Sequence, residues 1–518
     1  MAWLGRWKFY PLLFAAFPAL SFLARNIGQV GAVDIVRSLV VSLAMGLLIF
    51  GAMWLVLRDI GRAAVAASLV ALLALSYGHL YDGLKAIGLS GTTLVRHRYL
   101  VPAVLCVAVL GVLATSRIRS GRSWTGVMAA IAAVALLGPV LQITGYYVPL
   151  GLWSLGDRAR TDVCSLAPGS ANPDVYLIIL DAYEREDVLR EVRGYDNSEF
   201  LSELEDMRFY VAPGSLSNYS RTRLSLASLL NLNYVQDFPD LFGAGPSLPW
   251  LLTEKISDSL LRDELECLGY RTIAFETGIF WTEWRDADLF VQRDQSAFLL
   301  RAITRPELAF LNTTWFRAVF DAREQEKEGR SLPAPDPREE HRDRILFVLD
   351  ELERVAELPS PKFVFAHILS PHPPYVFGSQ GEDIRVGQFE TLPGEETGDA
   401  YTHQVAYLNT RVLEILRAIL RNSETPPVIV VMGDHGRTEE TPETRLAILN
   451  AYFLPEGVEG LYPTITPVNT FRLILNNIFG ATLALVPDRS YLSPRGDDLE
   501  FIPVPNTWSA EASPLDAP

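Results

Sequence analysis

The chain has 518 residues, 49% of them hydrophobic and 20% charged, a balance that excludes an intrinsically disordered or fibrous protein. The net charge of −16 averages two different parts: residues 1–160 carry 14 basic and four acidic side chains, whereas the rest carries 31 basic and 57 acidic ones. The acidic C-terminal part argues against nucleic acid as a partner, because phosphate binding requires clustered positive charge.

Five apolar runs fill the N-terminal part, and none of them contains a charged residue. A bilayer core requires about 20 apolar residues per helix, with a range of about 17–25. A signal peptide contributes one such run and not five, and the charges between the runs argue against buried helices of a soluble protein. The sequence therefore predicts a transmembrane domain of about five helices over residues 1–145, with runs at roughly Phe9–Ala24, Ser38–Leu57, Ala63–Leu80, Tyr99–Thr115 and Trp124–Ile143.

Basic residues between the runs favour one orientation by a narrow margin. With a cytoplasmic N-terminus, seven Lys and Arg fall in the inner segments and five in the outer loops, and positive charge prefers the inner side. We therefore expect a multi-pass protein of the inner (plasma) membrane, with everything after residue 145 on the outer, periplasmic side. In such an oxidising compartment Cys164 and Cys267 can pair, the alternative being two buried free thiols.

Alternating strands and helices follow a juxtamembrane linker over residues 146–172. The continuous apolar run Val175–Leu180 fits a central strand that is covered on both faces. The alternation predicts an α/β domain with a mainly parallel central sheet over residues 173–486, followed by a C-terminal tail over 487–518 to which no role is assigned. Further strands are expected at Phe209–Val211, Thr272–Phe275, Lys362–Leu369 and Val428–Met432, and helices at about 184–192, 197–206, 338–357 and 400–421.

Three of these strands end in polar residues. The first is followed by Asp181, the strand at Lys362–Leu369 runs into a loop with His372, and the strand at Val428–Met432 is followed by Asp434 and His435. Ligand sites of parallel sheets lie beyond the carboxyl ends of the strands. We therefore expect these side chains at one edge of the sheet.

Asp181, Asp434 and His435 are residue types that bind metals. Two oxygens and a nitrogen suit Zn²⁺ or Mn²⁺, with Mg²⁺ or Ca²⁺ as alternatives. Taken singly, Asp181 has an alternative role as a helix N-cap, and the Asp434-His435 pair as an ordinary turn. Their shared position at strand ends favours a divalent metal site.

A nucleophile for such a site is expected in a polar loop that turns into an apolar helix near Thr222. The start of a helix favours negative charge and presents free N–H groups, and a metal bound to the hydroxyl would lower its pKa further. Both effects would turn Thr222 into an alkoxide nucleophile. The alternative is that Thr222 only caps the helix.

Two histidines and two arginines are candidates for contact with substrate. His367 and His372 flank a short turn, and either can protonate a leaving oxygen or hold a phosphate. His367 lies in an apolar strand, where a packed core histidine is the alternative, so His372 is preferred as the catalytic group. Arg221 and Arg437 flank the nucleophile and the metal pair, and arginine binds phosphate or sulfate oxygens; a surface salt bridge is the alternative for each. Substrate binding is predicted for Arg221, His367 and Arg437.

These motifs resemble those of the alkaline phosphatase/sulfatase superfamily: a strand ending in Asp181, Ser-Arg-Thr222 before a helix, Pro-His372-Pro-Pro-Tyr and Gly-Asp434-His435-Gly. Five membrane helices ahead of them resemble its envelope branch, which includes lipoteichoic acid synthases and phosphoethanolamine transferases. The resemblance implies that Thr222 is covalently modified and then released. It also implies that Asp181, Asp434 and His435 hold the catalytic metal together with Thr222, and that His372 is the histidine on the substrate side.

Departures from the family patterns bear on the reaction. Ordinary sulfatases carry a Cys/Ser-x-Pro-x-Arg motif, which is absent here, and Asp-Asn in place of Asp434-His435. Both differences favour phosphoryl transfer over sulfate hydrolysis. Phosphoethanolamine transferases, in turn, carry Glu in place of Asp181 and a further histidine downstream, whereas no histidine follows His435.

The sequence therefore predicts a membrane-anchored, metal-dependent transferase that moves a phospholipid-derived phospho-head group, of the phosphoethanolamine or phosphoglycerol type, through a Thr222 intermediate. A membrane lipid is the expected donor, and an envelope glycan or lipid is the expected acceptor. One alternative is a phosphodiesterase or sulfate-ester hydrolase of the same fold, in which water is the acceptor. The other is a binding module or membrane scaffold without enzymatic activity.

Overall fold

The structure, a computed structural model, divides into two compact units. Unit 1 comprises Met1–Ser154 and Asp294–Asp336, and unit 2 comprises Leu155–Arg293 and Pro337–Pro518. These bounds differ from the predicted domains, because residues 294–336 group with the N-terminal helices although they lie in the middle of the predicted catalytic domain. The residues that the structure describes are 8–27, 30–89, 95–117, 121–157, 166, 172–238, 248–293, 305–326, 337–384, 396–437, 441–494 and 500–508.

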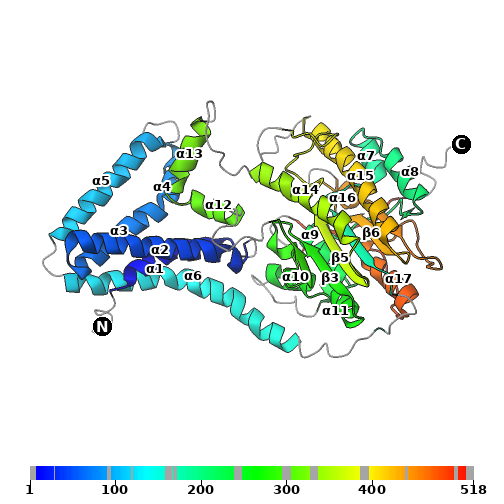
Figure 1. The fold of residues 1–518 in the computed structure, drawn as a ribbon, viewed down its shortest axis with the longest axis horizontal. Coiled ribbons are helices and arrows are strands. Elements are labelled where there is room, and N and C mark those ends of the chain that lie inside the picture. Colours follow the sequence, from blue (N-terminus) through cyan, green and yellow to red (C-terminus); the bar gives the residue numbers. More distant parts are fainter. Residues whose placement is uncertain are drawn as a thin grey trace. The chain divides into compact units, whose positions relative to one another are not determined.

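Apolar helices make up the first part of unit 1 (Figure 1). Among the described residues, Asp34–Leu57, His97–Ser116 and Trp124–Tyr146 are long and apolar enough to cross a membrane. A fourth span exists only if Ile60–Leu75 and Tyr77–Ile87, which meet at a bend of 53°, are counted together. The first helix has only 16 residues, so the predicted number of five spans is not confirmed. The helices are α1 (Tyr10–Arg25), α2 (Ala32–Leu57), α3 (Ile60–Leu75), α4 (Tyr77–Leu84), α5 (His97–Ser116) and α6 (Gly121–Asp157).

The bend between α3 and α4 is tied to the segment that unit 1 takes from the middle of the chain. The N–H of Gly78 donates to the carbonyl of Thr313 at 2.9 Å, and the N–H of Trp315 donates to the carbonyl of Ala74 at 2.8 Å. Backbone groups released by a broken membrane helix need such partners, because the bilayer core offers no water. The segment therefore supplies hydrogen-bond partners for the bend. It contains two helices, α12 (Arg305–Asn312) and α13 (Phe316–Glu326), and Thr313 and Trp315 lie between them.

A buried ion pair holds α12 to α2. Arg37 Nε donates to Glu307 Oε1 at 2.7 Å, and a second nitrogen of Arg37 donates to Glu307 Oε2. Close by, Phe310 of α12 packs edge-on against Phe22 of α1, with 5.9 Å between the ring centroids. A charged side chain in an apolar environment is costly unless it is paired. The pair therefore compensates both charges while the aromatic contact buries apolar surface.

Seven strands in the order β2-β7-β6-β1-β5-β3-β4 form the central sheet of unit 2. Strand β1 lies between β5 and β6 and is parallel to both, and β3 is parallel to β4 and β5. Only β7 runs against its neighbours β6 and β2, so the sheet is mainly parallel, as predicted. The strands are β1 (Val175–Leu180), β2 (Tyr210–Val211), β3 (Arg271–Phe275), β4 (Leu289–Val291), β5 (Lys362–Ile368), β6 (Val428–Gly433) and β7 (Asn450–Phe453).

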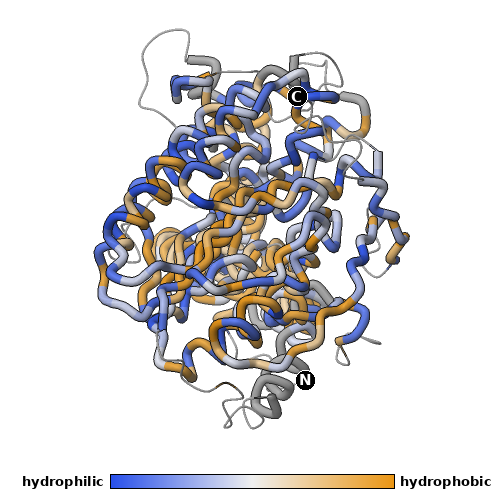
Figure 2. The backbone as a smooth tube through the Cα atoms, turned by 90° about the vertical axis from the view of Figure 1, so that its right-hand side faces the viewer, coloured by the Kyte–Doolittle hydropathy of each residue, from blue (hydrophilic) through white to orange (hydrophobic). Residues whose placement is uncertain are grey.

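Helices cover both faces of this sheet (Figure 1). On one face, alternate residues of β1 pack into one hydrophobic cluster with α8, α14 and α15. On the other face, Trp284 stacks on Phe365 of β5 and donates its indole N–H to the carbonyl of Ile256 in α10. Figure 2 shows the hydrophobic strands inside a shell of more hydrophilic helices. The helices are α7 (Glu186–Glu191), α8 (Ser198–Asp206), α9 (Thr222–Leu230), α10 (Leu248–Ser257), α11 (Leu260–Cys267), α14 (Pro337–Val355), α15 (Glu396–Asn422), α16 (Pro442–Leu446) and α17 (Pro467–Phe479).

The described residues after 486 are part of unit 2. Strand β8 (Ser490–Leu492) pairs with β9 (Ile502–Val504). The ring of Tyr491 stacks on Tyr219, with 5.8 Å between the centroids, and its N–H donates to the carbonyl of Asn218 at 2.9 Å. The stretch to which the sequence assigned no role thus supports the loop that leads into α9.

The cysteines follow the pattern expected outside the cytoplasm. Cys267, at the end of α11, is disulfide-bonded, and Cys106 in α5 is free. Cys164, the predicted partner of Cys267, lies outside the described residues. A disulfide at Cys267 agrees with the predicted oxidising compartment for unit 2.

Gly78 provides a test of the contact between the bend and the inserted segment. A Cβ at this position would lie 2.1 Å from the carbonyl oxygen of Asn312. We expect Gly78→Ala to displace the segment and to destabilise the full-length protein by about 1–3 kcal/mol, seen as a lower midpoint of thermal unfolding in detergent. Gly83→Ala is the control, because nothing lies within 4 Å of a Cβ there. Equal midpoints for the two variants would contradict this contact.

Candidate active site

The carboxyl ends of β1, β5 and β6 form one polar edge of the sheet. The N–H of Asp181, just beyond β1, donates to the carbonyl of Ile368 at the end of β5. The N–H of His372 in the following loop donates to the carbonyl of Asp181, each at 2.9 Å. Strand β6 lies on the other side of β1, and Asp434 follows it. The three predicted strand ends therefore meet at one place.

Asp181, Asp434 and His435 form a buried group of metal-binding residues. One ligand atom from each lies within 4.8 Å of the others. His435 Nε2 is 3.4 Å from Asp434 Oδ2 and 4.0 Å from Asp181 Oδ1. Ligand atoms that surround a tetrahedral ion at about 2.0–2.2 Å lie about 3.4 Å from one another. A small inward movement of Asp181 would bring all three onto one ion.

The hydrogen bonding of the two carboxylates fits such an ion. Asp434 Oδ1 accepts from the N–H groups of Ala182 and His435, each at 3.0 Å. In contrast, Asp434 Oδ2 and Asp181 Oδ1 are buried and accept no hydrogen bond from the described part of the chain. A buried carboxylate oxygen without a donor is costly. A divalent cation would supply the positive charge that these two oxygens lack.

The protonation states also fit a metal site. Burial raises the pKa of Asp181, but the neighbouring His372, His367 and His435 lower it by more, so the pKa lies below its usual value. Burial lowers the pKa of His435, because the imidazolium form loses more hydration than the neutral ring. At neutral pH Asp181 is then ionised and His435 neutral, the forms that bind metals. His435 Nδ1 donates to the carbonyl of Gly436 at 2.9 Å, which leaves the lone pair of Nε2 for the metal.

Tight backbone contacts place the ligands. A Cβ on Gly433 would lie 2.4 Å from the carbonyl oxygen of Tyr183, and a Cβ on Gly436 would lie 2.5 Å from another carbonyl oxygen. Glycine on both sides of the Asp434-His435 pair is therefore required by the close approach of backbone. Ala182 has a φ of 65°, a left-handed conformation that is uncommon for a residue with a Cβ. Strain of this kind often marks a functional turn.

Thr222 is the first residue of α9, and its hydroxyl faces the metal-binding group. Thr222 Oγ1 lies 3.0 Å from His435 Nε2. The N-cap position is occupied by Arg221, so Thr222 is not the simple cap that was considered as an alternative. Thr222 is half-buried, whereas Asp181, Asp434 and His435 are buried. A substrate that approaches the metal-binding group can therefore reach Thr222.

Two side chains tie the loop before α9 to the loop after β6. Ser217 Oγ donates to the carbonyl of Asp434 at 2.5 Å. Arg445 donates to the carbonyl of Ser220 through Nε at 3.1 Å and Nη2 at 2.8 Å, and its Nη1 donates to the carbonyl of Gly436. Because one guanidinium holds both loops, Arg445 fixes the position of the Thr222 loop relative to the Asp434-His435 loop.

The two predicted histidines differ in their surroundings. His372 is half-buried, and its Nδ1 donates to the carbonyl of Pro373 at 2.6 Å, which leaves Nε2 for other contacts. His367 is only 1% exposed, and its Nε2 lies 3.5 Å from Asp181 Oδ2. Neither ring nitrogen of His367 has a hydrogen-bond partner among the described residues, and its side chain lies behind Asp181. The geometry therefore favours His372 for contact with substrate, and it gives His367 a supporting position.

Both predicted arginines make contacts within the protein. Arg221 donates to the carbonyl of Ser493 at 3.4 Å and to that of the next residue. Arg437 is buried, and its guanidinium lies 5.1 Å from the centre of the Tyr401 ring. Their role in substrate binding stays a prediction.

The sequence analysis missed three residues that support the site, Arg445, Glu184 and Tyr401. Glu184 is fully buried, accepts from two nitrogens of Arg193 at 2.7 and 2.8 Å, and accepts from the N–H of Arg437 at 3.1 Å. Tyr401 of α15 donates to the carbonyl of Ala182 at 2.9 Å. Of these three residues, only Glu184 could have been found from the sequence. It lies three residues after Asp181, and a charge so close to a buried strand requires a partner.

Comparison with known proteins finds similarity in structure. No family model matches the chain, and no curated protein matches it in sequence. The C-terminal periplasmic domain of EcEptC from Escherichia coli, in complex with Zn, matches over 65% of this chain and 94% of that one, with 13% identity and a TM-score of 0.41.

Two further structures carry names of the groups that the motifs resemble. The integral membrane lipooligosaccharide phosphoethanolamine transferase A (EptA) from Neisseria meningitidis matches over 92% of this chain and 95% of that one, with 13% identity and a TM-score of 0.36. The lipoteichoic acid synthase LtaP from Listeria monocytogenes matches over 63% and 80%, with 14% identity and a TM-score of 0.36.

Removal of His435 tests the metal site. We expect His435→Ala to weaken divalent metal binding by more than about 100-fold, since the loss of supporting groups alone costs about 10–100-fold. The full-length protein would be loaded with Zn²⁺ and dialysed against a series of chelators of increasing affinity for the metal. Its metal content would then be measured by plasma mass spectrometry. His403→Ala is the matched control, because His403 is exposed on α15. Equal metal retention by His435→Ala and the control would overturn the assignment of the site.

Proposed function

We propose that unit 2 is a metal-dependent transferase that moves a phospho-head group from a membrane phospholipid to an envelope acceptor through a covalent bond to Thr222. One observation carries the proposal: the hydroxyl oxygen of Thr222 lies 3.0 Å from His435 Nε2. This nitrogen belongs to the group in which two buried carboxylate oxygens lack hydrogen bonds from the described residues. A hydroxyl group and three metal-binding residue types thus lie together at one polar edge, which supports the proposal.

The proposed metal is Zn²⁺ or Mn²⁺, bound by Asp181, Asp434, His435 and the hydroxyl of Thr222. An imidazole nitrogen among the ligands suits these ions better than Mg²⁺ or Ca²⁺, which prefer oxygen. When bound, the metal lowers the pKa of a hydroxyl in contact with it and stabilises charge on the transferred phosphoryl group.

The chemistry of the first step follows from the position of Thr222. Its oxygen gives its proton to solvent water and forms a bond to phosphorus, while the bond from phosphorus to the diacylglycerol oxygen breaks. The N–H groups at the start of α9 favour the negative charge on the attacking oxygen. We assign protonation of the leaving oxygen to His372, which is half-buried at the same edge.

The second step returns the enzyme to its starting state. A hydroxyl of the acceptor gives its proton to His372 and attacks phosphorus, the bond from phosphorus to the Thr222 oxygen breaks, and that oxygen takes a proton from solvent water. The same histidine then acts as acid in one half and base in the other. Arg437 and Arg221 are proposed to be near the phosphoryl oxygens, with Arg437 held by its contact with Tyr401.

The helices of unit 1 support a lipid as the donor. At least three of the described helices are long and apolar enough to cross a membrane, so the chain holds its catalytic unit at a bilayer. The disulfide at Cys267 and the count of basic residues support a periplasmic location for unit 2. A phospholipid is therefore available at high local concentration, whereas a soluble donor would not require the anchor.

Intact mass of the purified protein tests the covalent step. We expect the wild-type protein, with Zn²⁺ or Mn²⁺ and bacterial phospholipids, to gain the mass of one head-group phosphate on Thr222, which identifies the donor. Thr222→Ala should show no adduct and no turnover, because it has no nucleophile. Thr222→Ser keeps a hydroxyl and should retain the adduct at a lower rate, while unfolding midpoints of all three should agree within a few degrees.

The outcome also separates transfer from hydrolysis. If the adduct forms and turnover requires an added envelope glycan or lipid, the transferase is supported. Cleavage of phosphodiesters or sulfate esters by water alone, with no adduct on the wild type and no effect of an acceptor, would overturn it in favour of a hydrolase. Undiminished activity of Thr222→Ala would remove Thr222 from the mechanism.

A further inference from the structure

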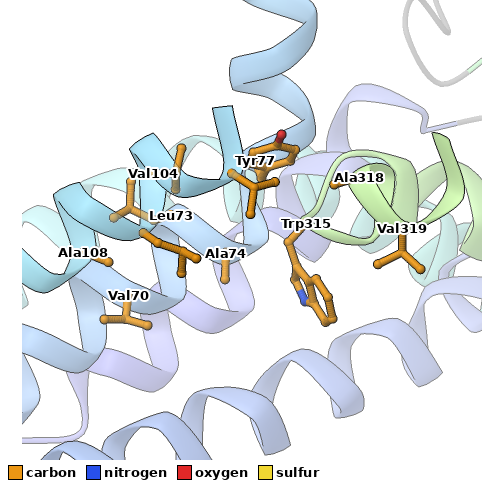
Figure 3. Close-up of a pocket in the computed structure, with 11 residues that line it drawn as sticks. Val70, Leu73, Ala74, Tyr77, Val104, Ala108, Trp315, Ala318 and Val319 are labelled. Carbon is orange, nitrogen blue, oxygen red and sulfur yellow. The ribbon is translucent and has the colours of Figure 1, made fainter. Parts of the chain in front are cut away.

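Unit 1 contains an apolar cavity of about 600 Å³ that the proposed chemistry in unit 2 does not use. This volume lies within the range of about 300–1,000 Å³ that is typical of small-molecule sites. Figure 3 shows Trp315 between side chains of α3 and α5 and those of α13. The lining is almost entirely apolar and includes Val70, Leu73, Val104, Ala108, Trp315 and Val319.

One side of the cavity is formed by α13, which belongs to the inserted segment. The segment is fixed by the hydrogen bond from the N–H of Trp315 to the carbonyl of Ala74 and by the ion pair of Arg37 with Glu307. A Cβ on Gly78 would collide with Asn312, so the segment lies as close as backbone allows. The cavity is therefore bounded by a fixed element on this side, and it is partly open to its surroundings.

A polar cluster adjoins the apolar lining through Tyr77. Tyr77 lines the cavity, and its hydroxyl is 2.8 Å from His97 Nδ1. His97 Nε2 in turn is 2.7 Å from Asp321 Oδ2 on α13. The His97 ring stacks on Tyr81 at 4.3 Å between centroids. The lining of the cavity thus changes from apolar to polar along the side chain of Tyr77.

Two cations lie against the same Tyr81 ring. Lys85 Nζ is 4.3 Å from its centroid, and the guanidinium carbon of Arg317 is 5.4 Å from it. Arg317 also forms an ion pair with Asp321 at 2.9 Å, so a bound phosphate would share this guanidinium with a carboxylate. The described residues of this region, 77–89, 95–98 and 316–321, hold four Lys or Arg and two Asp. Tyrosine, tryptophan and basic side chains gather where a bilayer meets water, which is the level of lipid phosphates.

We infer that this site binds a glycerophospholipid, with an acyl chain in the cavity and its phosphate at the cluster of Tyr81, Lys85 and Arg317. An apolar chain joined to an anionic phosphate is the chemistry that matches both halves of the site. Binding here goes beyond the proposed function and does not depend on it. Only the further assignment of the bound lipid as the donor rests on the proposed function.

Photolabelling of the full-length protein tests the acyl-chain half. The probes are phosphatidylethanolamine and phosphatidylglycerol with a diazirine at the end of one acyl chain, in phosphatidylcholine vesicles. We expect label on peptides of α5 and α13, and an Ala108→Trp variant should lose it by at least about fivefold, because the indole fills the cavity. The control is Val107→Trp, which places the same side chain at a neighbouring residue that is 53% exposed and does not line the cavity. Equal labelling of the two variants would overturn the inference.

A comparison of phospholipid with diacylglycerol tests whether the site binds the phosphate. Diacylglycerol with the same diazirine lacks the phosphate. It should label these peptides more weakly than whichever of the two phospholipid probes labels them more strongly. Arg317→Gln should lower phospholipid labelling about tenfold, as loss of a charge-assisted contact predicts, and should leave diacylglycerol labelling unchanged. Arg58→Gln, at the exposed end of α2, is the control for loss of charge. Equal labelling by both lipid classes, unaffected by Arg317→Gln, would exclude a phosphate site.

Labelling does not require turnover, so the same experiment in a Thr222→Ala background separates this inference from the proposed function. Retained label on α13 with no Thr222 adduct in the wild type would support the lipid site and reject the donor chemistry. An adduct on Thr222 without label on α13 would do the reverse. If Ala108→Trp failed to fold, shown by its unfolding midpoint, Arg317→Gln would decide the outcome.

Discussion

The candidate site depends on holding two carboxylates, Asp181 and Asp434, close together inside the protein. Like charges repel strongly where water is excluded, so this arrangement requires compensating positive charge. Arg445 is near both carboxylates, but it donates its hydrogen bonds to the carbonyl groups of Ser220 and Gly436. The oxygens that face His435 are left for a cation. The strained turn at Ala182 is held by two hydrogen bonds, one from its N–H to Asp434 and one from the Tyr401 hydroxyl to its carbonyl.

The central part of the site follows from the sequence because parallel strands end at the same edge of a sheet. Asp181, Asp434 and His435 could be placed together from the apolar runs that precede them, and Thr222 from the loop that turns into a helix. Arg445 could not be found in this way. Its role depends on two carbonyl groups from loops more than 200 residues apart in the chain, and such a contact leaves no pattern in either loop. The difference between His367 and His372 likewise depends on burial that only packing determines.

Unit 1 shows that hydropathy alone does not reveal a bend within an apolar run. The apolar run predicted at Ala63–Leu80 contains the end of α3 and the start of α4, which meet at 53°. No Pro lies at this bend, and what stabilises it is the backbone of Thr313 and Trp315, more than 200 residues later. The segment that supplies these groups includes charged residues such as Glu307 and Arg317, and the sequence analysis placed it within the predicted domain over residues 173–486. The ion pair with Arg37 removes the cost of the Glu307 charge.

The chain passes between the two units three times, because residues 294–336 leave unit 2 and return to it. An anchor needs only one connection, so the second excursion calls for another explanation. The inserted segment completes the hydrogen bonds of a broken helix, forms one side of an apolar cavity and contributes Arg317 to the cluster beside it. A lipid bound there would contact a segment that is covalently continuous at both ends with unit 2.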